Sequence, residues 1–442
     1  MNTSIAREFR FGELLKFSFP SIIMMIFMSL YTIVDGFFVS RFVGTDALSA
    51  INIVYPLLSV FVAIAVMFAT GGSAVVSKQL GEGEEQEAKQ NFTLIVMASL
   101  AVTAIVMLLS FCFLNPLIRL LGADESLMRY CREYLIILLI FAPLSVLQML
   151  FQNFFVTAGR PGLGLGLTIL AGLANMALDY LFIVPFGLGI AGAALATAAG
   201  YCIPAFGGLI FFFKNKRGLH FGRPKLRPKI LVESSFNGSS EMVTNLSASV
   251  TTLLFNIMMM RFAGPDGVAA ITVVLYCQFL MTALFLGFSI GVAPVISYHY
   301  GAQNYGYLKK LITMCGGFTL AGPVIVFITS FCSSTLIASV FSPPGSPVYP
   351  LVAHGMRLFS ISFLFAGVNV FGSALFTALS NGKVSATISF SRTFLFTVAG
   401  ILILPQLFEM DGLWLSIPFA EAVTVLFVAL FLKRLKTRYG IF

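Results

Sequence analysis

The chain has 442 residues, of which 58% are hydrophobic and 10% are charged, and its mean hydropathy is +0.95. A soluble domain carries roughly 25% charged residues, so this composition excludes a soluble enzyme held by a single anchor. The net charge of +9 does not indicate nucleic-acid binding, because the basic residues are spread over alternating loops. The six cysteines form no CxxC pair and have no zinc-ligand spacing, so no cofactor is expected.

The first apolar segment, residues 14–40, carries a carboxylate near its far end. The twenty residues before Asp35 contain no acid and one base, Lys16. An Asp at the centre of a membrane helix costs about 2.5 to 3.5 kcal/mol, so Asp35 is a functional candidate. Tyr31 precedes it by four residues and lies on the same helix face.

Twelve apolar segments of transmembrane length follow one another along the chain, which predicts an all-α polytopic membrane protein. Gly- and Pro-rich turns separate them. They cover residues 14–40, 47–77, 91–114, 131–157, 163–184, 189–213, 231–262, 268–297, 308–331, 350–378, 385–404 and 411–432.

Loops rich in Lys and Arg alternate along the chain with loops that contain few of them. With the N-terminus inside, the inner segments hold 20 Lys and Arg and the outer loops hold five. The positive-inside rule therefore predicts a multi-pass protein of the cytoplasmic (inner) membrane with both termini in the cytoplasm.

A tandem repeat with a constant offset in the numbering divides the chain. Residues 41–46 (RFVGTD) recur at 261–266 (RFAGPD), and Gly81, Cys112 and Pro185 have identical residues at the same offset. Each copy holds six helices, so the two copies share one topology and form parallel repeats. We expect an N-lobe at 1–213, a basic cytoplasmic linker at 214–230 and a C-lobe at 231–442.

Three helices of the first repeat bring polar groups to one depth. Asn175 and Asp179 lie one turn apart on the fifth helix, and Thr197 lies on the sixth. Asp35 and Asp179 are both ~9 Å from the outer ends of their helices. Two neighbouring carboxylates cannot both ionise cheaply, so the pair can hold a proton. The oxygens of Asp35, Asn175, Asp179 and Thr197 also suit Na⁺, and a static hydrogen-bond network is the alternative.

The second repeat lacks these acids, because Phe255 and Ala399 stand where the first has Asp35 and Asp179. This asymmetry assigns cation handling to the first lobe. Glu241, on the seventh helix, is either a substrate-facing carboxylate or a structural one. Glu421 and Arg392 lie at comparable depth and are expected to pair.

Several motifs together resemble the multidrug and toxic compound extrusion (MATE) family over essentially the whole chain. They are residues 31–35 (YTIVD) through 41–50 (RFVGTDALSA), residues 152–161 (QNFFVTAGRP), Asn175 with Asp179, and Glu241 after residues 237–240 (NGSS).

The resemblance implies two six-helix lobes in a V that export organic cations in exchange for H⁺ or Na⁺. In the DinF-like branch the cation cluster looks like Tyr31, Asp35, Asn175, Asp179 and Thr197. Pro20 resembles the proline at which the first helix can bend. Glu241, with Gln152 and Asn153, would contribute to the substrate cavity. Ala366 departs from the acid that the NorM-like branch carries on helix 10, so a complete second-lobe cation site is not expected.

The sequence therefore predicts a monomeric, non-enzymatic antiporter for cationic amphiphilic molecules. One alternative is a lipid-linked oligosaccharide flippase of the same fold, which would need a basic cavity for pyrophosphate. Here the intramembrane acids outnumber the bases four to two. A third possibility is an intramembrane aspartyl hydrolase built on Asp35 and Asp179, for which a two-lobe repeat has no evident purpose.

Overall fold

In the computed structural model, the described part of the chain, residues 5–216 and 218–439, consists of helices joined by short loops and contains no strands. Residues 1–4, Arg217 and 440–442, which belong to the predicted lobes and linker, lie outside it, as do the side chains of residues 36, 37, 40, 45, 48 and 435–439. The first half contains α1 (Phe11–Phe38), the π-helical turn η1 (Val39–Val43), α2 (Thr45–Gly81), α3 (Glu85–Cys112), α4 (Leu114–Leu120), α5 (Glu125–Ile140), α6 (Ala142–Thr157), α7 (Pro161–Ile183) and α8 (Gly189–Lys214).

The second half repeats this order. It contains α9 (Pro228–Gly301), α10 (Tyr305–Cys332), α11 (Ser334–Phe341), α12 (Val348–Ser360), α13 (Phe363–Ala378), α14 (Gly382–Phe390), the π-helical turn η2 (Ser391–Leu395), α15 (Phe396–Trp414) and α16 (Ser416–Tyr439). Helices α3 and α10 begin and end at positions related by the repeat offset, and α4 and α11 begin at such positions. The predicted tandem repeat is therefore confirmed in the order of the elements.

The helices of the described residues account for twelve membrane crossings. Nine are long and apolar enough to span by themselves, and two bent pairs, α5 with α6 and α12 with α13, each make one more. Helix α9 has 74 residues and folds back at Gly264, where φ is +63°, so it supplies two crossings. Glycine adopts this backbone conformation without the strain that a Cβ would introduce.

Two of the segments predicted as single helices are bent. The segment expected at 131–157 begins at Glu125 and turns by 54° between α5 and α6, and the one expected at 350–378 turns by 53° between α12 and α13. The breaks at Phe141 and at Ile361 occupy corresponding positions of the repeat, so both lobes share the bend. The short helices α4 and α11 lie in stretches that were expected to be loops.

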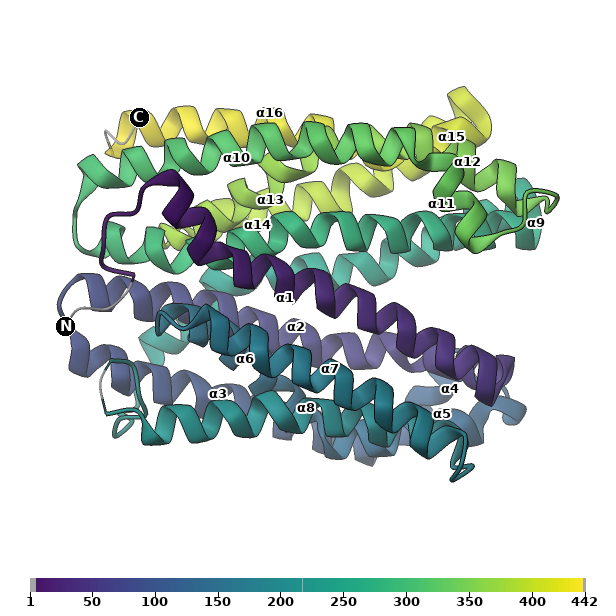
Figure 1. Ribbon diagram of the computed structural model, residues 1–442, viewed down its shortest axis with the longest axis horizontal. Helices are drawn as coiled ribbons and strands as arrows, with labels where there is room; N and C mark the ends of the chain where they lie inside the picture. Colours follow the sequence, from purple (N-terminus) through teal and green to yellow (C-terminus); the bar gives the residue numbers. More distant parts are fainter. Residues whose placement is uncertain (1–4, 217, 440–442) are drawn as a thin grey trace.

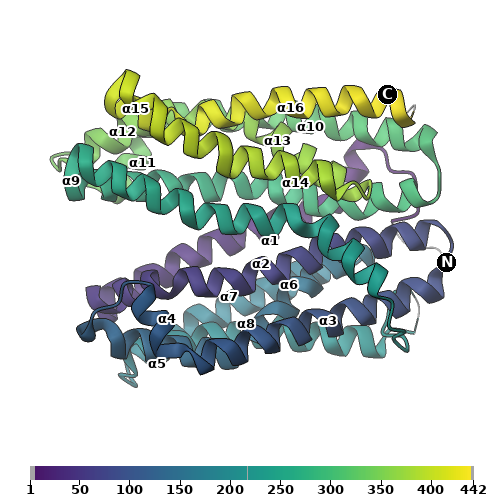
Figure 2. The same cartoon turned by 180° about the vertical axis from the view of Figure 1, so that it is seen from behind.

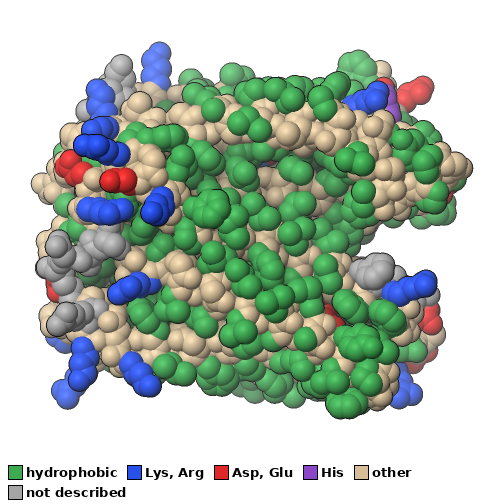
Figure 3. Space-filling view, in the orientation of Figure 1, with side chains coloured by type: hydrophobic (Ala, Val, Ile, Leu, Met, Phe, Trp, Pro, Cys, Tyr) green, Lys and Arg blue, Asp and Glu red, His purple; other side chains and the backbone are tan. Residues whose placement is uncertain are grey.

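The two lobes form a V. Figures 1 and 2 show α2–α8 on one side, α9–α16 on the other, and α1 along the boundary between them. Both termini lie at the same end of the molecule. Figure 3 shows Lys and Arg side chains gathered at that end and a notch between the lobes at the other. The lobes are thus joined at the terminal end and separated at the opposite end.

Glycines allow the lobes to touch at the terminal end. A Cβ on Gly71 of α2 would lie 1.9 Å from the carbonyl oxygen of Ser234, and one on Gly238 of α9 would lie 1.9 Å from that of Met67. The same kind of contact joins Gly81 to Tyr298. Backbones can approach this closely only where no side chain intervenes, as in other small-residue helix contacts in membranes.

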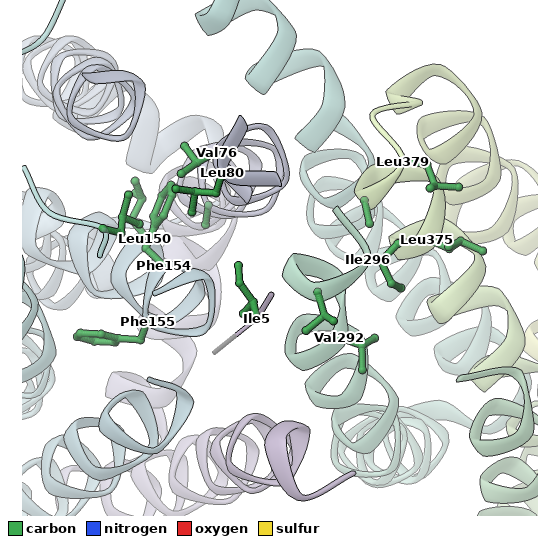
Figure 4. Close-up of a cluster of buried hydrophobic side chains, with 14 of the residues drawn as sticks. Ile5, Val76, Leu80, Leu150, Phe154, Phe155, Val292, Ile296, Leu375 and Leu379 are labelled. Atoms are coloured by element: carbon green, nitrogen blue, oxygen red, sulfur yellow. The ribbon is translucent and has the colours of Figure 1, made fainter. Parts of the chain in front are cut away.

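The segment before α1 also closes this end. Ile5 is fully buried, and Figure 4 shows its side chain between Val76 and Leu80 of α2 on one side and Val292 of α9 on the other. The Tyr307 hydroxyl accepts a hydrogen bond from the Phe9 amide at 2.5 Å. The segment therefore starts between the lobes and is fastened to the C-lobe.

We expect Gly238→Ala to destabilise the protein, because the added methyl overlaps the Met67 carbonyl and the lobes must move apart. Overpacking of this kind costs typically about 1–3 kcal/mol. Gly316→Ala on α10 is the matched control, since a Cβ there meets nothing within 4 Å. Thermal unfolding of both purified variants tests this. Equal melting temperatures for the two variants would contradict the close contact.

Candidate functional site

The structure brings together the side chains of three N-lobe helices near the open end. Asp35 lies in the last turns of α1, Asn175 and Asp179 lie one turn apart on α7, and Thr197 lies on α8. Asp179 is fully buried and Asn175 is 3% exposed, whereas Asp35 is partly accessible. The polar face predicted from the sequence is therefore inside the lobe.

Two small residues position these helices. A Cβ on Gly172 of α7 would lie 2.5 Å from a ring carbon of Phe27 and 3.3 Å from one of Tyr31, so α1 packs directly on α7 at this level. Gly200 of α8 would place a Cβ 3.5 Å from the Cβ of Asn175. The close approach of α1 and α8 to α7 is what carries Asp35 and Thr197 toward Asp179.

The defining feature of the site is a set of buried oxygens without hydrogen-bond donors. The Asp35 and Asp179 carboxyl groups interact directly. Among the described residues, no donor reaches Asp35 Oδ1, Asn175 Oδ1, Thr197 Oγ1 or either carboxyl oxygen of Asp179. A proton on either carboxyl group would form a hydrogen bond to the other, because both are acceptors when ionised.

The oxygen atoms of the site are suitable ligands for a small hard cation. Two carboxylates, an amide oxygen and a hydroxyl are the oxygen ligands that such a cation prefers. Within residues 5–216 and 218–439 no ion pair or hydrogen bond joins a Lys or Arg to these four residues. An uncompensated buried acid pair is costly, so the site favours whatever supplies positive charge.

Tyrosines surround the acid pair, and two of them were not predicted. Tyr134 of α5 interacts electrostatically with both Asp35 and Asp179, and Tyr201 of α8 interacts with Asp35 and Tyr31. The Tyr31 hydroxyl contacts the amide of Gln148. Tyr201 could have been found from the sequence, since it follows Thr197 by four residues and shares its helix face.

The other predicted site residues lie apart from this cluster. Gln152 is 5% exposed and donates to the Thr168 hydroxyl at 3.2 Å, and Asn153 donates to the Met149 carbonyl on its own helix. Pro20 lies within α1, which continues as one helix from Phe11 to Phe38. Glu241 is half-buried on α9 in the C-lobe.

The C-lobe contains the expected ion pair, in which Arg392 Nε donates to Glu421 Oε1 at 2.7 Å. A second C-lobe pair, His354 Nε2 and Asp411 Oδ1, also 2.7 Å apart, is exposed. Ala366, the position that lacks the family acid, is buried at 3% exposure in the C-lobe core.

The fold is that of several solved transporters. A structure described as MATE in complex with MaL6 superposes with a TM-score of 0.92 at 20% identity, covering 98% of this chain and 99% of that one. An outward-facing multidrug resistance MATE family transporter of the MOP superfamily gives 0.91 at 20% identity, with 98% of each chain covered.

Similarity in sequence extends over the same length. The multidrug export protein MepA of Staphylococcus saprophyticus is 22% identical over 437 residues, which is 97% of this chain and 94% of MepA. MepA of Staphylococcus aureus N315 is 23% identical over 410 residues, covering 91% and 88%. The MatE family model matches residues 20–181 and again residues 242–402. Because these two matches lie in corresponding parts of the two lobes and cover more than half of the 442 residues, the chain belongs to the MatE (MATE) family of transporters.

Proposed function

We propose that this protein is a multidrug efflux antiporter that exports organic cations in exchange for H⁺ or Na⁺ by alternating access. The observation that carries the proposal is the buried pair of Asp35 and Asp179, whose oxygens lack donors among the described residues. Membrane acids of this kind mark ion pathways. The names of the MepA relatives, multidrug export proteins, support the export of drugs.

The proposed orientation places both termini in the cytoplasm, because Lys and Arg gather at the terminal end of the molecule (Figure 3). The notch between the lobes then opens to the outside of the cytoplasmic membrane, and the conformation is outward-open. Asp35, in the last turns of α1, lies toward that opening. The coupling ion would therefore enter from outside, where its concentration is higher.

Coupling follows from what a cation does to the acid pair. An H⁺ or Na⁺ at Asp35, Asn175, Asp179 and Thr197 removes the repulsion between the carboxylates and draws α1, α7 and α8 together. Since α1 also packs on α9 through Ser18 and Gly291, a change in α1 reaches the interface between the lobes. Pro20 lies between these two contacts and is the place at which α1 would bend.

Drug and ion need only bias the two lobe arrangements in opposite directions. The proposed cargo is a cationic amphiphile carried by a monomer. Glu241, the acid proposed for the cavity, is half-buried and forms no ion pair with the described residues, so it can face a cationic cargo. Gln152 and Asn153 are the polar residues proposed for the cavity from the N-lobe.

The rival functions receive less support. A flippase must hold a pyrophosphate, and the acid pair in the N-lobe would repel it. An intramembrane hydrolase would use the same two aspartates but has no need of two lobes that separate. Cleavage of a lipid or peptide by the purified protein would be required to favour it.

Asp35→Asn is expected to reduce drug resistance of expressing cells to the level of cells without the transporter, because the pair can no longer be switched by a cation. Asp46→Asn is the matched control, since Asp46 is an exposed carboxylate just beyond the same helix. Growth in ethidium and membrane abundance of both variants are measured together. Resistance at wild-type level in Asp35→Asn would refute the proposal.

The Thr197→Val variant distinguishes Na⁺ from H⁺ as the coupling ion, because it removes one proposed Na⁺ ligand oxygen and keeps the side-chain shape. If Na⁺ is bound, the Na⁺ concentration for half-maximal ethidium efflux should rise about tenfold, as expected for about 1.4 kcal/mol of lost coordination. If H⁺ is used, efflux driven by a pH gradient should change little. Vesicles with separately imposed pH and Na⁺ gradients distinguish the two. Thr329→Val serves as control, because Thr329 bonds only to its own helix on α10.

A further inference from the structure

A second buried charged cluster lies in the C-lobe. Glu421 of α16 is 3% exposed, and its Oε1 accepts a hydrogen bond from Arg392 Nε at 2.7 Å. Asn369 of α13, itself fully buried, donates at 2.6 Å to Oε2 and at 2.8 Å to the backbone carbonyl of Glu421. Both carboxylate oxygens therefore have a donor, and three separate elements hold one carboxylate in place.

The tandem repeat places this cluster where the N-lobe has its acid pair. Glu421 corresponds to Tyr201, which interacts with Asp35, and Arg392 corresponds to Gly172, on which α1 packs. At the positions of Asp35 and Asp179 the C-lobe has Phe255 and Ala399. The C-lobe thus has a single carboxylate at this location, and its positive charge belongs to the chain itself.

A third charge lies on a helix that packs against the element carrying Arg392, because α9 contacts η2. Glu241 of α9 is half-buried and interacts electrostatically with Arg392. Arg392 nevertheless forms its ion pair with Glu421, and no described residue donates a hydrogen bond to the Glu241 carboxylate. The guanidinium therefore lies near two carboxylates and is bound to one of them.

Removing Glu421 and removing Arg392 would have different consequences for Glu241. Without Glu421 the guanidinium would have one carboxylate left to pair with, Glu241, and attraction between unit charges is strong at low dielectric constant. Without Arg392 the buried Glu421 would need a proton or a metal cation, while Glu241 would stay as it is. Loss of Glu421 would therefore give Glu241 a new partner, whereas loss of Arg392 would not.

We propose that Glu421 is a positioning residue which, with Asn369, holds Arg392 as the built-in cation of the C-lobe and so keeps Glu241 unpaired for a cationic cargo. The inference rests on the proposed function and deepens it. It assigns the mobile coupling ion to the N-lobe alone, because the corresponding place in the C-lobe is filled by the chain's own guanidinium.

The test is ethidium binding to the purified full-length protein, followed by fluorescence anisotropy. Glu421→Gln should weaken binding at least tenfold, because the freed Arg392 captures Glu241. Arg392→Met and the double variant Arg392→Met with Glu421→Gln should both bind within threefold of the wild type. The double variant removes both charges of the ion pair together and keeps similar side-chain volumes. Proteins often tolerate such a replacement of a buried ion pair.

Two further comparisons separate positioning from mere structural support. In a Glu241→Gln background, Glu421→Gln should have no further effect on ethidium binding. Arg357→Met is the matched control, because Arg357 donates to the Ser334 hydroxyl elsewhere in the same lobe. A structural pair would instead give equal losses for Glu421→Gln and Arg392→Met, together with equal losses of thermal stability.

The inference is overturned if folded Glu421→Gln binds ethidium like the wild type, or if its loss persists in the Glu241→Gln background. Should Glu421→Gln fail to fold, the double variant decides, since a tenfold loss in it would also overturn the inference. Wild-type protein that exports ethidium while all variants bind alike refutes only this inference. Wild-type protein that neither binds nor exports ethidium refutes the proposed function and the inference with it.

Discussion

The facing carboxylates of Asp35 and Asp179 are the constraint on which the rest of the N-lobe depends. Their oxygens are buried, and donors from the described residues do not reach them. Close helix packing at Gly172 and Gly200 holds them there. Burying an acid pair costs less free energy when a cation is bound, so the N-lobe favours the cation-bound state. This preference is what can be coupled to the position of α1, which contacts both lobes.

The two lobes share an architecture and differ in their electrostatics. Helix α3 and helix α10, the bends between α5 and α6 and between α12 and α13, and the short helices α4 and α11 all recur at the repeat offset. The buried charges do not recur. In the part of the chain that the structure describes, Asp35 and Asp179 of the N-lobe form no ion pair with a Lys or Arg, whereas Glu421 of the C-lobe is paired with Arg392. One fold thus carries two different sets of buried charges, in lobes joined at the terminal end by glycine contacts.

Most of the candidate site could be predicted because a membrane helix makes polar residues expensive. Asp35, Asn175, Asp179 and Thr197 were found from cost, helical spacing and depth, and the structure brings them together. Tyr134 was missed, because a tyrosine in an apolar helix carries no such cost and its neighbours depend on the rotation of α5. Tyr201 was missed although it shares a helix face with Thr197. Gln152, predicted for the substrate cavity, donates to Thr168, a contact that the helical spacing did not indicate.

The twelve crossings, the repeat, the charge asymmetry of the loops and the acids of the first lobe could all be predicted from the amino-acid sequence. These follow from hydrophobic length, from identity at a fixed offset and from the cost of charge in lipid. Only the tertiary structure decided which end of the V is open, where α5–α6 and α12–α13 bend, and that Ile5 lies between the lobes. These features are set by contacts between helices far apart in the chain. The pairing of Arg392 with Glu421 was expected from their depth, but only the packing of α9 and α16 against η2, and of α13 against α16, decided that Asn369 joins that pair and that Glu241 does not.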